Sequence, residues 1–329
     1  MHLFLVNNPI SLKVACLLVK HKNLKPGEYK LFTTDPNCAR ISINEMSLTL
    51  LPSSTYLSPA DWKRTYTHIT DSLGSYCGNN AIAYVPHLWN SSHLLLAGHQ
   101  CVQSYCYIEE GLGSSKTKAN MPPHYESHHD ISEMSELIRS ELIEYTKNFL
   151  ASNGISVELN PDTNRLIAAY YILPSSFKTI ANKKRFAIDV SNEVILVPSR
   201  PINAVLLPGI ASIGTDIPSL FMPKIAESII SHLNSSDIII LKAHRSTPIL
   251  WLTSILKYIL DYGLLVEEWS YFMSNEFGSS ARTEDPCVIQ LNSCIIYDSL
   301  SALQYMLRYN NYNNLMFFKA PCTHPVRVL

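Results

Sequence analysis

The sequence predicts an α/β protein built from two doubly wound domains that face each other across a cleft. Short apolar runs alternate with longer amphipathic runs along both halves of the chain, a rhythm typical of βα units around a parallel sheet. The 329 residues exceed one typical core, and 47% hydrophobic against 16% charged residues provide enough apolar side chains for two cores.

The first half contains predicted strands and helices in alternation. A Ser58-Pro59 pair marks the start of one helix, and apolar residues spaced as on one helix face indicate another over 131–151. The strands are expected at 2–6, 28–33, 81–85 and 104–109, and the helices at 11–21, 59–73, 91–99 and 131–151.

A turn-rich segment separates the two halves. Ser152-Asn-Gly154 and Asn160-Pro-Asp-Thr-Asn164 both interrupt the apolar pattern, so we expect the domain boundary between about 155 and 190. The two predicted domains are therefore 1–170 and 171–329.

The second half repeats the same rhythm. Residues 237–242 are apolar without alternation, as expected of a strand that is covered on both faces. The strands are expected at 193–197, 203–207, 237–242, 264–267, 287–291 and 313–318, and the helices at 218–233, 247–262 and 299–309.

Charge and cysteine usage exclude several classes of protein. A net charge of −1 gives no basic excess for binding nucleic acid. The eight cysteines are scattered without a C-x-x-C pair, which indicates free thiols in a reducing cytoplasm. No stretch reaches the roughly 18 uninterrupted apolar residues of a membrane span.

Three groups of polar residues follow predicted strands. An apolar strand runs into Glu109-Glu110-Gly111, where glycine permits a sharp turn and the close approach of a ligand. Ligands of open α/β sheets bind beyond the carboxyl ends of the strands, and the alternation of a strand turns two adjacent carboxylates opposite ways. The other groups are Lys242-Ala-His244 and Gly278-Ser-Ser280. Each group alone is a common pattern, and their order along the chain is what points to a function.

In this order, the three groups resemble the motifs of bacterial sialyltransferases of the GT-B fold, of the lipooligosaccharide sialyltransferase and capsular polysialyltransferase types. Those enzymes carry an Asp/Glu-Asp/Glu-Gly motif, a later Lys-x-His-Pro motif and then a Ser-Ser or Ser-Thr motif. The resemblance implies two Rossmann-like domains. It also implies transfer of sialic acid from CMP-sialic acid to a sugar hydroxyl of a lipooligosaccharide, an O-antigen or a capsule.

Carried over to this sequence, the resemblance makes 1–170 the acceptor-side domain and places the catalytic general base on Glu109, with Glu110 as its substitute. Domain 171–329 would bind the CMP-sugar, and a catalytic His244 would contact the donor phosphate and help the leaving group. The donor-binding residues that the resemblance implies are Lys242, Gly278, Ser279 and Ser280, with the serines on the phosphate, and Glu267 or Glu268 on the ribose.

One position departs from the family pattern. Where the family has His-Pro, this chain has His244-Arg245, and a proline follows only at Pro248. Proline normally fixes the turn into the next helix, so the turn after His244 is not fixed in the family's way.

The proposed chemistry needs these types of residue. A sugar hydroxyl is a poor nucleophile until a base accepts its proton, and a glutamate is such a base. A protonated histidine, serine hydroxyls and a helix N-terminus can stabilise the phosphate of the leaving nucleotide. No Asp-x-Asp, the usual holder of a metal on a diphosphate donor, occurs in the chain, so we expect a metal-independent reaction without a cofactor. A single displacement would invert the anomeric centre.

Several alternatives stay open at this point. Another CMP-activated acid sugar, such as Kdo or a legionaminic-type sugar, would need the same machinery, and a different sugar-nucleotide transferase can share the fold. A non-catalytic carbohydrate-binding protein would carry the motifs by coincidence. The expected partners are a CMP-sugar donor and a glycan or glycolipid acceptor, without nucleic acid. The expected location is cytoplasmic, and a homodimer and a peripheral contact with the inner membrane are left open.

Overall fold

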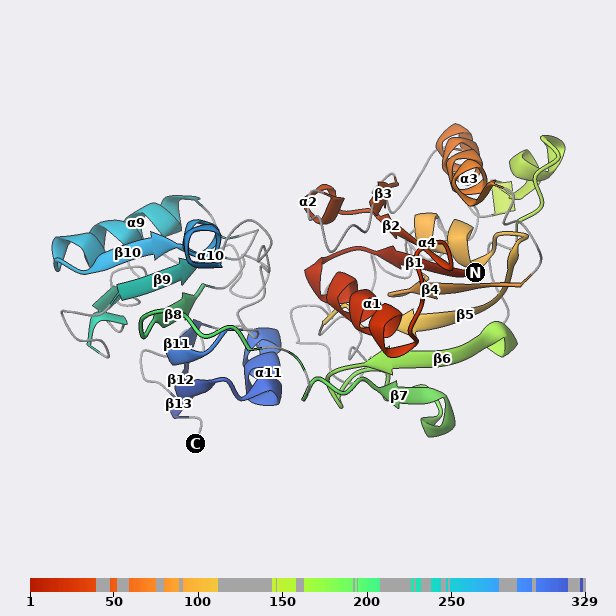
Figure 1. The fold of residues 1–329 in the computed structure, drawn as a ribbon. Coiled ribbons are helices and arrows are strands. Elements are labelled where there is room, and N and C mark those ends of the chain that lie inside the picture. The colour runs from red at the N-terminus through yellow and green to blue at the C-terminus, as the bar shows by residue number, and fades with distance from the viewer. Residues whose placement is uncertain are drawn as a thin grey trace. The chain divides into compact units, whose positions relative to one another are not determined.

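The chain forms two compact units, Met1–Asp189 and Val190–Leu329 (Figure 1). The boundary lies at the late end of the expected range 155–190 and not at 170/171, because that position falls inside a strand of the first sheet, Leu166–Tyr171. The computed structural model describes residues 1–39, 48–51, 59–74, 80–88, 91–111, 144–145, 147–157, 163–191, 193, 195–207, 226–227, 229–231, 238–243, 247, 249–277, 289–297, 300–318 and 326–327.

The sheet of the first unit is parallel, and its described strands have the order β3-β2-β1-β4-β5-β6-β7 (Figure 1). The chain adds β2 and β3 on one side of β1 and then returns to place β4 on the other side. The direction in which strands are added therefore reverses between β1 and β4. The strands are β1 (His2–Val6), β2 (Tyr29–Thr33), β3 (Leu48–Leu50), β4 (Ala81–Val85), β5 (Val102–Ile108), β6 (Leu166–Tyr171) and β7 (Arg185–Ala187).

The first helix of this unit, Pro9–His21, begins at a side-chain cap, and two later helices bury apolar side chains on the sheet. The side chain of Asn8 accepts a hydrogen bond from the backbone of Ser11 at 2.9 Å, and Pro9 fits the first turn of the helix that follows. Side chains of α3 and α4 pack with Leu3 and Leu5 of β1 in one core. The described helices are α1 (Pro9–His21), α2 (Pro36–Ala39), α3 (Pro59–Leu73) and α4 (Ser91–Ala97).

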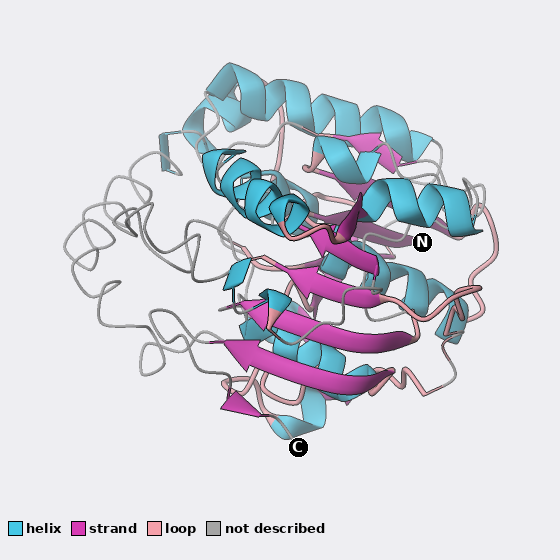
Figure 2. Cartoon of the chain, turned by 90° about the vertical axis from the view of Figure 1, so that its left-hand side faces the viewer, coloured by secondary structure: helices cyan, strands magenta, loops and turns pink. Residues whose placement is uncertain are grey.

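The second unit repeats the arrangement, with its described strands in the order β10-β9-β8-β11-β12-β13, as labelled in Figure 1. Figure 2 shows strands in magenta and helices in cyan. All neighbours in this sheet are parallel except β12 and β13. The direction of addition reverses between β8 and β11. The elements are β8 (Asn203–Leu206), β9 (Ile238–Lys242), α9 (Ile249–Asp261), β10 (Leu265–Glu268), α10 (Trp269–Phe277), β11 (Leu291–Tyr297), α11 (Leu300–Tyr309), β12 (Tyr312–Phe318) and β13 (Val326–Arg327).

Two expected strands of the second unit are wrong. The strand expected at 287–291 lies instead at Leu291–Tyr297. Polar residues near its start interrupt the apolar pattern from which strands are predicted. Ser293 is nevertheless buried, because its hydroxyl donates a hydrogen bond to Oδ1 of Asn203 at 2.5 Å. The strand expected at 193–197 is only an isolated bridge, between Leu196 and Ile289.

Other differences concern elements that were not expected or not covered. The strands β3, β6, β7 and β13 and the helices α2 and α10 extend the predicted pattern. The expected helices 131–151 and 218–233 fall mostly outside the described residues. Within the described part of the chain, no helix is long and apolar enough to cross a membrane.

Candidate functional site

Polar side chains gather where three neighbouring strands of the first sheet end. Asn7 and Asn8 follow β1, His87 follows β4, and Glu110 follows β5. The strands β1, β4 and β5 are consecutive neighbours in the parallel sheet, so their carboxyl ends meet at one edge. This edge includes the position between β1 and β4 where strand addition reverses, which is where open α/β sheets bind their ligands.

The carboxylate of Glu110 is the centre of this group, which we call the Glu110 cluster (Asn7, Asn8, His87 and Glu110). Its Oε2 accepts a hydrogen bond from Nδ2 of Asn7 at 2.5 Å and lies 3.6 Å from Nε2 of His87. Its backbone oxygen accepts a hydrogen bond from Nδ2 of Asn8 at 3.0 Å. The Glu110 side chain is 14% exposed and that of His87 is 22% exposed, so solvent reaches both.

The start of α1 orients the two asparagines. The hydroxyl of Ser11 donates to Oδ1 of Asn7 at 3.1 Å, which turns the Nδ2 donor of Asn7 toward Glu110. Oδ1 of Asn8 caps the helix, and its Nδ2 is left for the Glu110 backbone. A helix start therefore presents two amide donors to one residue.

Gly111 allows the chain to leave the strand at this point. Its φ of +101° is a backbone conformation that residues other than glycine rarely adopt. A Cβ at this position would also lie 3.1 Å from Cδ1 of Ile10 in α1. The glycine of the Glu-Glu-Gly motif is thus required by both backbone conformation and space.

Glu109 has quite different surroundings from Glu110. It is fully buried, and its Oε2 accepts hydrogen bonds from the backbone nitrogens of Ile172 at 2.6 Å and Leu173 at 2.9 Å. These two residues follow β6, so the Glu109 carboxylate ties the end of β5 to the end of its neighbour. The two adjacent carboxylates point to different surroundings, as the alternation of side chains along a strand requires.

The sequence did not identify Asn7 or His87 as site residues. Neither residue belongs to the three sequence motifs, and a histidine after a strand is a common feature. The signal that could have found both residues is their position, since each lies within two residues of the end of β1 or β4. These are the strands that flank the reversal of the sheet.

On the second unit, the structure describes three of the predicted donor-binding residues. Lys242 ends β9, and its Nζ lies 5.6 Å from the ring centroid of Trp269, a cation–π distance. Oε1 of Glu267 accepts a hydrogen bond from Nη2 of Arg200 at 2.6 Å. Glu268 directly precedes α10 and caps its first turn, because its Oε2 accepts a hydrogen bond from the backbone nitrogen of Tyr271 at 3.1 Å.

Lys242, Glu267 and Glu268 all lie at the carboxyl ends of neighbouring parallel strands. The pairing of β9 with β10 sets Glu268 opposite Leu241. This is the edge on which a nucleotide-binding domain holds its ligand. The other predicted residues of this side, His244, Gly278, Ser279 and Ser280, lie outside the described residues.

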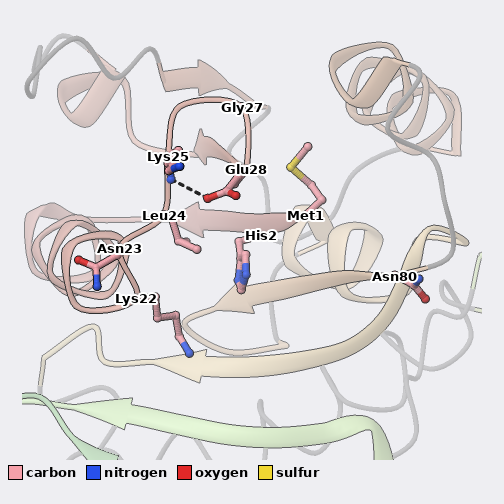
Figure 3. A pocket seen from close by; sticks show the side chains of 9 residues that line it. All are labelled: Met1, His2, Lys22, Asn23, Leu24, Lys25, Gly27, Glu28 and Asn80. Atoms are coloured by element: carbon pink, nitrogen blue, oxygen red, sulfur yellow. Dashed lines mark hydrogen bonds between the residues drawn. The ribbon is translucent and has the colours of Figure 1, made fainter.

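A separate hollow of about 690 Å³ opens at the opposite edge of the first sheet (Figure 3). It adjoins the start of β1, whereas the Glu110 cluster adjoins its end. The hollow is lined by Met1, His2, Lys22, Asn23, Leu24, Lys25, Gly27, Glu28 and Asn80. Because ligands of such sheets bind at the carboxyl edge, we place the candidate site at Glu110 and not in this hollow.

The described residues also bear on metal binding and thiol chemistry. Among them, no three His, Cys, Asp or Glu side chains are grouped so as to hold a metal ion. Burial raises the pKa of the Cys106 thiol to about 12, which keeps this thiol protonated and unreactive.

Several solved structures are similar to this chain in fold. A structure from Listeria monocytogenes described as a UDP-N-acetylglucosamine 2-epimerase matches 98% of this chain and 80% of its own, at 8% identity and a TM-score of 0.50. A glycosyltransferase from Rickettsia africae ESF-5 matches 98% of this chain and 84% of its own, at 10% identity and a TM-score of 0.49. The lipopolysaccharide outer core galactosyltransferase WaaB matches 98% and 87%, at 8% identity and a TM-score of 0.42.

At such low identity, the likeness to the Listeria structure shows the fold alone, and the two lower scores add nothing to it. The expected α/β fold with two Rossmann-like domains, as in the GT-B class, is confirmed. No protein-family model matches the chain, and no curated protein matches it in sequence.

Proposed function

We propose that the chain is a glycosyltransferase that moves sialic acid from CMP-sialic acid to a sugar hydroxyl of a bacterial surface glycan, with inversion and without a metal. The observation that carries the proposal is the Glu110 cluster, a partly exposed carboxylate with amide and imidazole groups at the reversal of the first sheet. Support also comes from the two-domain fold and from the resemblance of the three sequence motifs to those of sialyltransferases.

In this proposal Glu110, and not Glu109, is the general base. A base must reach the hydroxyl of a bound acceptor, and Glu109 is fully buried with an oxygen already engaged by two backbone amides. Glu110 is partly exposed at the ligand-binding edge. The hydrogen bond from the Asn7 amide orients the carboxylate, so less conformational entropy is lost when the reacting groups come together.

The reaction would proceed by one displacement. The acceptor oxygen attacks the anomeric carbon of the sialic acid as its proton passes to Glu110. The bond between the anomeric carbon and the phosphate oxygen breaks, and CMP leaves with the electron pair. Attack on the side opposite the leaving group inverts the anomeric centre, and no second carboxylate is needed as a nucleophile.

The donor side of the proposal rests on the second unit. Lys242 ends a strand at the carboxyl edge, and its ammonium group lies over the ring of Trp269, which limits its motion. We assign this charge to the donor phosphate, together with His244, Gly278, Ser279 and Ser280. Glu267 or Glu268 at the end of β10 would contact the ribose. All of these donor roles come from the resemblance.

The choice of donor is directly testable. Unfolding temperatures measured with CMP, UDP and GDP should rise most with CMP. A ligand at a hundred times its dissociation constant adds about 2.7 kcal/mol to stability, which such a scan detects. A rise in unfolding temperature with UDP alone would indicate a UDP-sugar donor in place of a CMP-sugar. The assignment of Glu110 as the base would not be affected.

A transfer assay completes the test. CMP-sialic acid, CMP-Kdo and UDP-N-acetylglucosamine are each incubated with galactose-terminated and sialic-acid-terminated acceptors. Transfer from CMP-sialic acid supports the proposal, and transfer from CMP-Kdo alone favours the alternative acid-sugar donor. Nucleotide-independent glycan binding without turnover of any donor would mean that the chain is a carbohydrate-binding protein.

A further inference from the structure

Two histidines lie next to each other beside Glu110, and one of them is fully buried. His87 follows β4 and belongs to the Glu110 cluster, whereas His93 lies in α4 and has no exposed surface. Their ring centroids are 4.4 Å apart. Nδ1 of His93 lies 3.1 Å from the backbone oxygen of His87 and 3.3 Å from Nδ1 of His87.

The contacts of His93 determine where its proton lies. A carbonyl oxygen can only accept a hydrogen bond, so the 3.1 Å contact requires a proton on Nδ1 of His93. Burial lowers the pKa of His93 well below its usual value, and the neighbouring His87 lowers it further, so the ring is neutral with one proton. The opposite tautomer would leave a buried N–H at Nε2, which has no hydrogen-bond partner among the described residues.

The proton of His93 in turn determines the tautomer of His87. Because the Nδ1–H of His93 faces Nδ1 of His87, that nitrogen is an acceptor and the proton of a neutral His87 is on Nε2. Nε2 lies 3.6 Å from Oε2 of Glu110. The 3.5 Å distance between Nε2 of His87 and Nδ2 of Asn7 is at the limit of a hydrogen bond, whereas the contacts of His93 with His87 are 3.1 and 3.3 Å, so the closer His93 contacts determine the tautomer.

We propose that His93 is a positioning residue that holds His87 with its proton on Nε2, so that His87 donates a hydrogen bond to the acceptor sugar beside the base Glu110. The inference rests on the proposed function and deepens it by naming the acceptor class. A donor and a proton acceptor this close together fit two oxygens on neighbouring carbons of one sugar ring. One oxygen would give its proton to Glu110 as the other accepts from His87, so the acceptor is a saccharide with vicinal oxygens.

The tautomers can be measured in the ligand-free protein, whether or not it proves to be a transferase. Two-bond ¹H–¹⁵N correlation spectra of protein with ¹⁵N-labelled histidine rings distinguish Nδ1–H from Nε2–H. The signals of His87 and His93 are identified by their loss in His87→Gln and His93→Asn. At neutral pH we expect Nε2–H for His87 and Nδ1–H for His93. Nδ1–H on His87 would overturn the inference.

A matched pair of variants tests the positioning role. His93→Asn keeps a donor near the place of Nδ1, whereas His93→Leu fills the space without one. We expect His93→Asn to retain the Nε2–H signal of His87 and most of the turnover. We expect His93→Leu to mix the two tautomers of His87 and to lower kcat about tenfold to a hundredfold, the range that outer partners of metal-bound histidines show. Wild-type kcat in a folded His93→Leu with mixed tautomers, or an equal loss in both variants, would contradict the role.

An acceptor lacking the neighbouring oxygen tests the contact itself. Removing that oxygen should slow the wild-type enzyme but cost His87→Ala little more, because both changes delete the same hydrogen bond. Independent, multiplying losses would show that His87 does not contact this oxygen. Failure of transfer with every donor would refute the proposed function, and the tautomer measurement would still decide the arrangement of the two histidines.

Discussion

Glu109 and Glu110 are neighbours in the chain, yet the first carboxylate is fully buried on the backbone of Ile172 and Leu173 and the second is partly exposed against Asn7. The pair therefore divides two tasks at the end of one strand. Glu109 joins β5 to β6, and Glu110 faces the edge where a ligand would bind. The same substitution should therefore lower mainly stability at Glu109 and mainly activity at Glu110.

Glu109→Gln should lower stability, because a neutral amide is a weaker acceptor for the two buried backbone amides than a carboxylate. Hydrogen bonds to a charged group contribute about 1.5–3 kcal/mol, so we expect a loss of about 1–3 kcal/mol in the free energy of unfolding. Urea titration measures this loss. Glu110→Gln, at the partly exposed neighbour, is the control and should change stability less. Equal stability of the two variants would contradict the structural role of Glu109.

Gly111→Ala should destabilise the first unit for two reasons that a control separates. Its φ of +101° is unfavourable for alanine, and the new Cβ would lie 3.1 Å from Ile10 Cδ1. Gly27 has a similar φ of +94° with open space around it, so Gly27→Ala reports the backbone cost alone, about 1–2 kcal/mol.

The contact cost then appears as the difference between the two alanine variants. Adding Ile10→Val to Gly111→Ala removes the crowded Cδ1 atom and should recover part of that difference. Thermal unfolding of the four proteins is the measurement. If Gly111→Ala lowers stability no more than Gly27→Ala does, helix α1 moves away from the new Cβ at little cost. The close packing of the turn on α1 would then not hold Glu110 in position.

His99 should make the first unit sensitive to acid. It is fully buried, its Nδ1 accepts from the backbone of Cys101 at 3.2 Å, and its Nε2 lies 3.0 Å from Oγ1 of Thr70. Burial lowers the pKa of His99 to about 4, from the usual 6.5 of a histidine. The unfolded chain therefore binds the proton first, so stability is retained above pH 6.5 and is lost as the pH falls from 6.5 toward 4, by roughly 3 kcal/mol.

The matched variant for this effect is His99→Asn. Asparagine can accept from the backbone two residues ahead as His99 does, but it does not titrate. The free energy of unfolding, measured by urea titration at pH 7, 6 and 5, should fall less steeply with pH in the variant. An unchanged slope would assign the acid sensitivity to other groups, such as the buried His93.

Chelation tests the proposed absence of a metal in the reaction. The sequence has no Asp-x-Asp pair to hold a metal against a diphosphate donor. Transfer should therefore proceed in EDTA at the rate measured without it. Loss of activity in EDTA, with recovery on adding Mg²⁺ or Mn²⁺, would point to a diphosphate-linked donor instead of a CMP-sugar.

Much of the fold follows from local pattern. The helix predicted at 59–73 has those bounds in the structure, and the strand predicted at 2–6 is β1. The same pattern fails where polar residues lie near the start of a buried strand, as Asn292 and Ser293 do in β11, because their partner Asn203 lies far away in the sequence. The strand β6, which contains two alanines, was not predicted and lies where the domain boundary was expected.

The site shows the same limit. Alternation along a strand predicts that only one of Glu109 and Glu110 enters the site, but the choice depends on amides that β6 delivers more than sixty residues later. Asn7 and Glu110 lie 103 residues apart in sequence and meet only because β1, β4 and β5 are neighbours. Sequence pattern predicts the strand ends, and only the strand order shows which ends meet.

The most direct test of the account is the rate of sialic acid transfer by Glu110→Gln and Glu109→Gln beside the wild type, each corrected for the fraction of folded protein. We predict that Glu110→Gln lowers kcat by a factor of about a hundred or more, as loss of a general base does, and keeps its stabilisation by CMP. Glu109→Gln should retain most of its kcat per folded molecule. Wild-type kcat in Glu110→Gln, or the larger loss in folded Glu109→Gln, would contradict the assignment of Glu110 as the base.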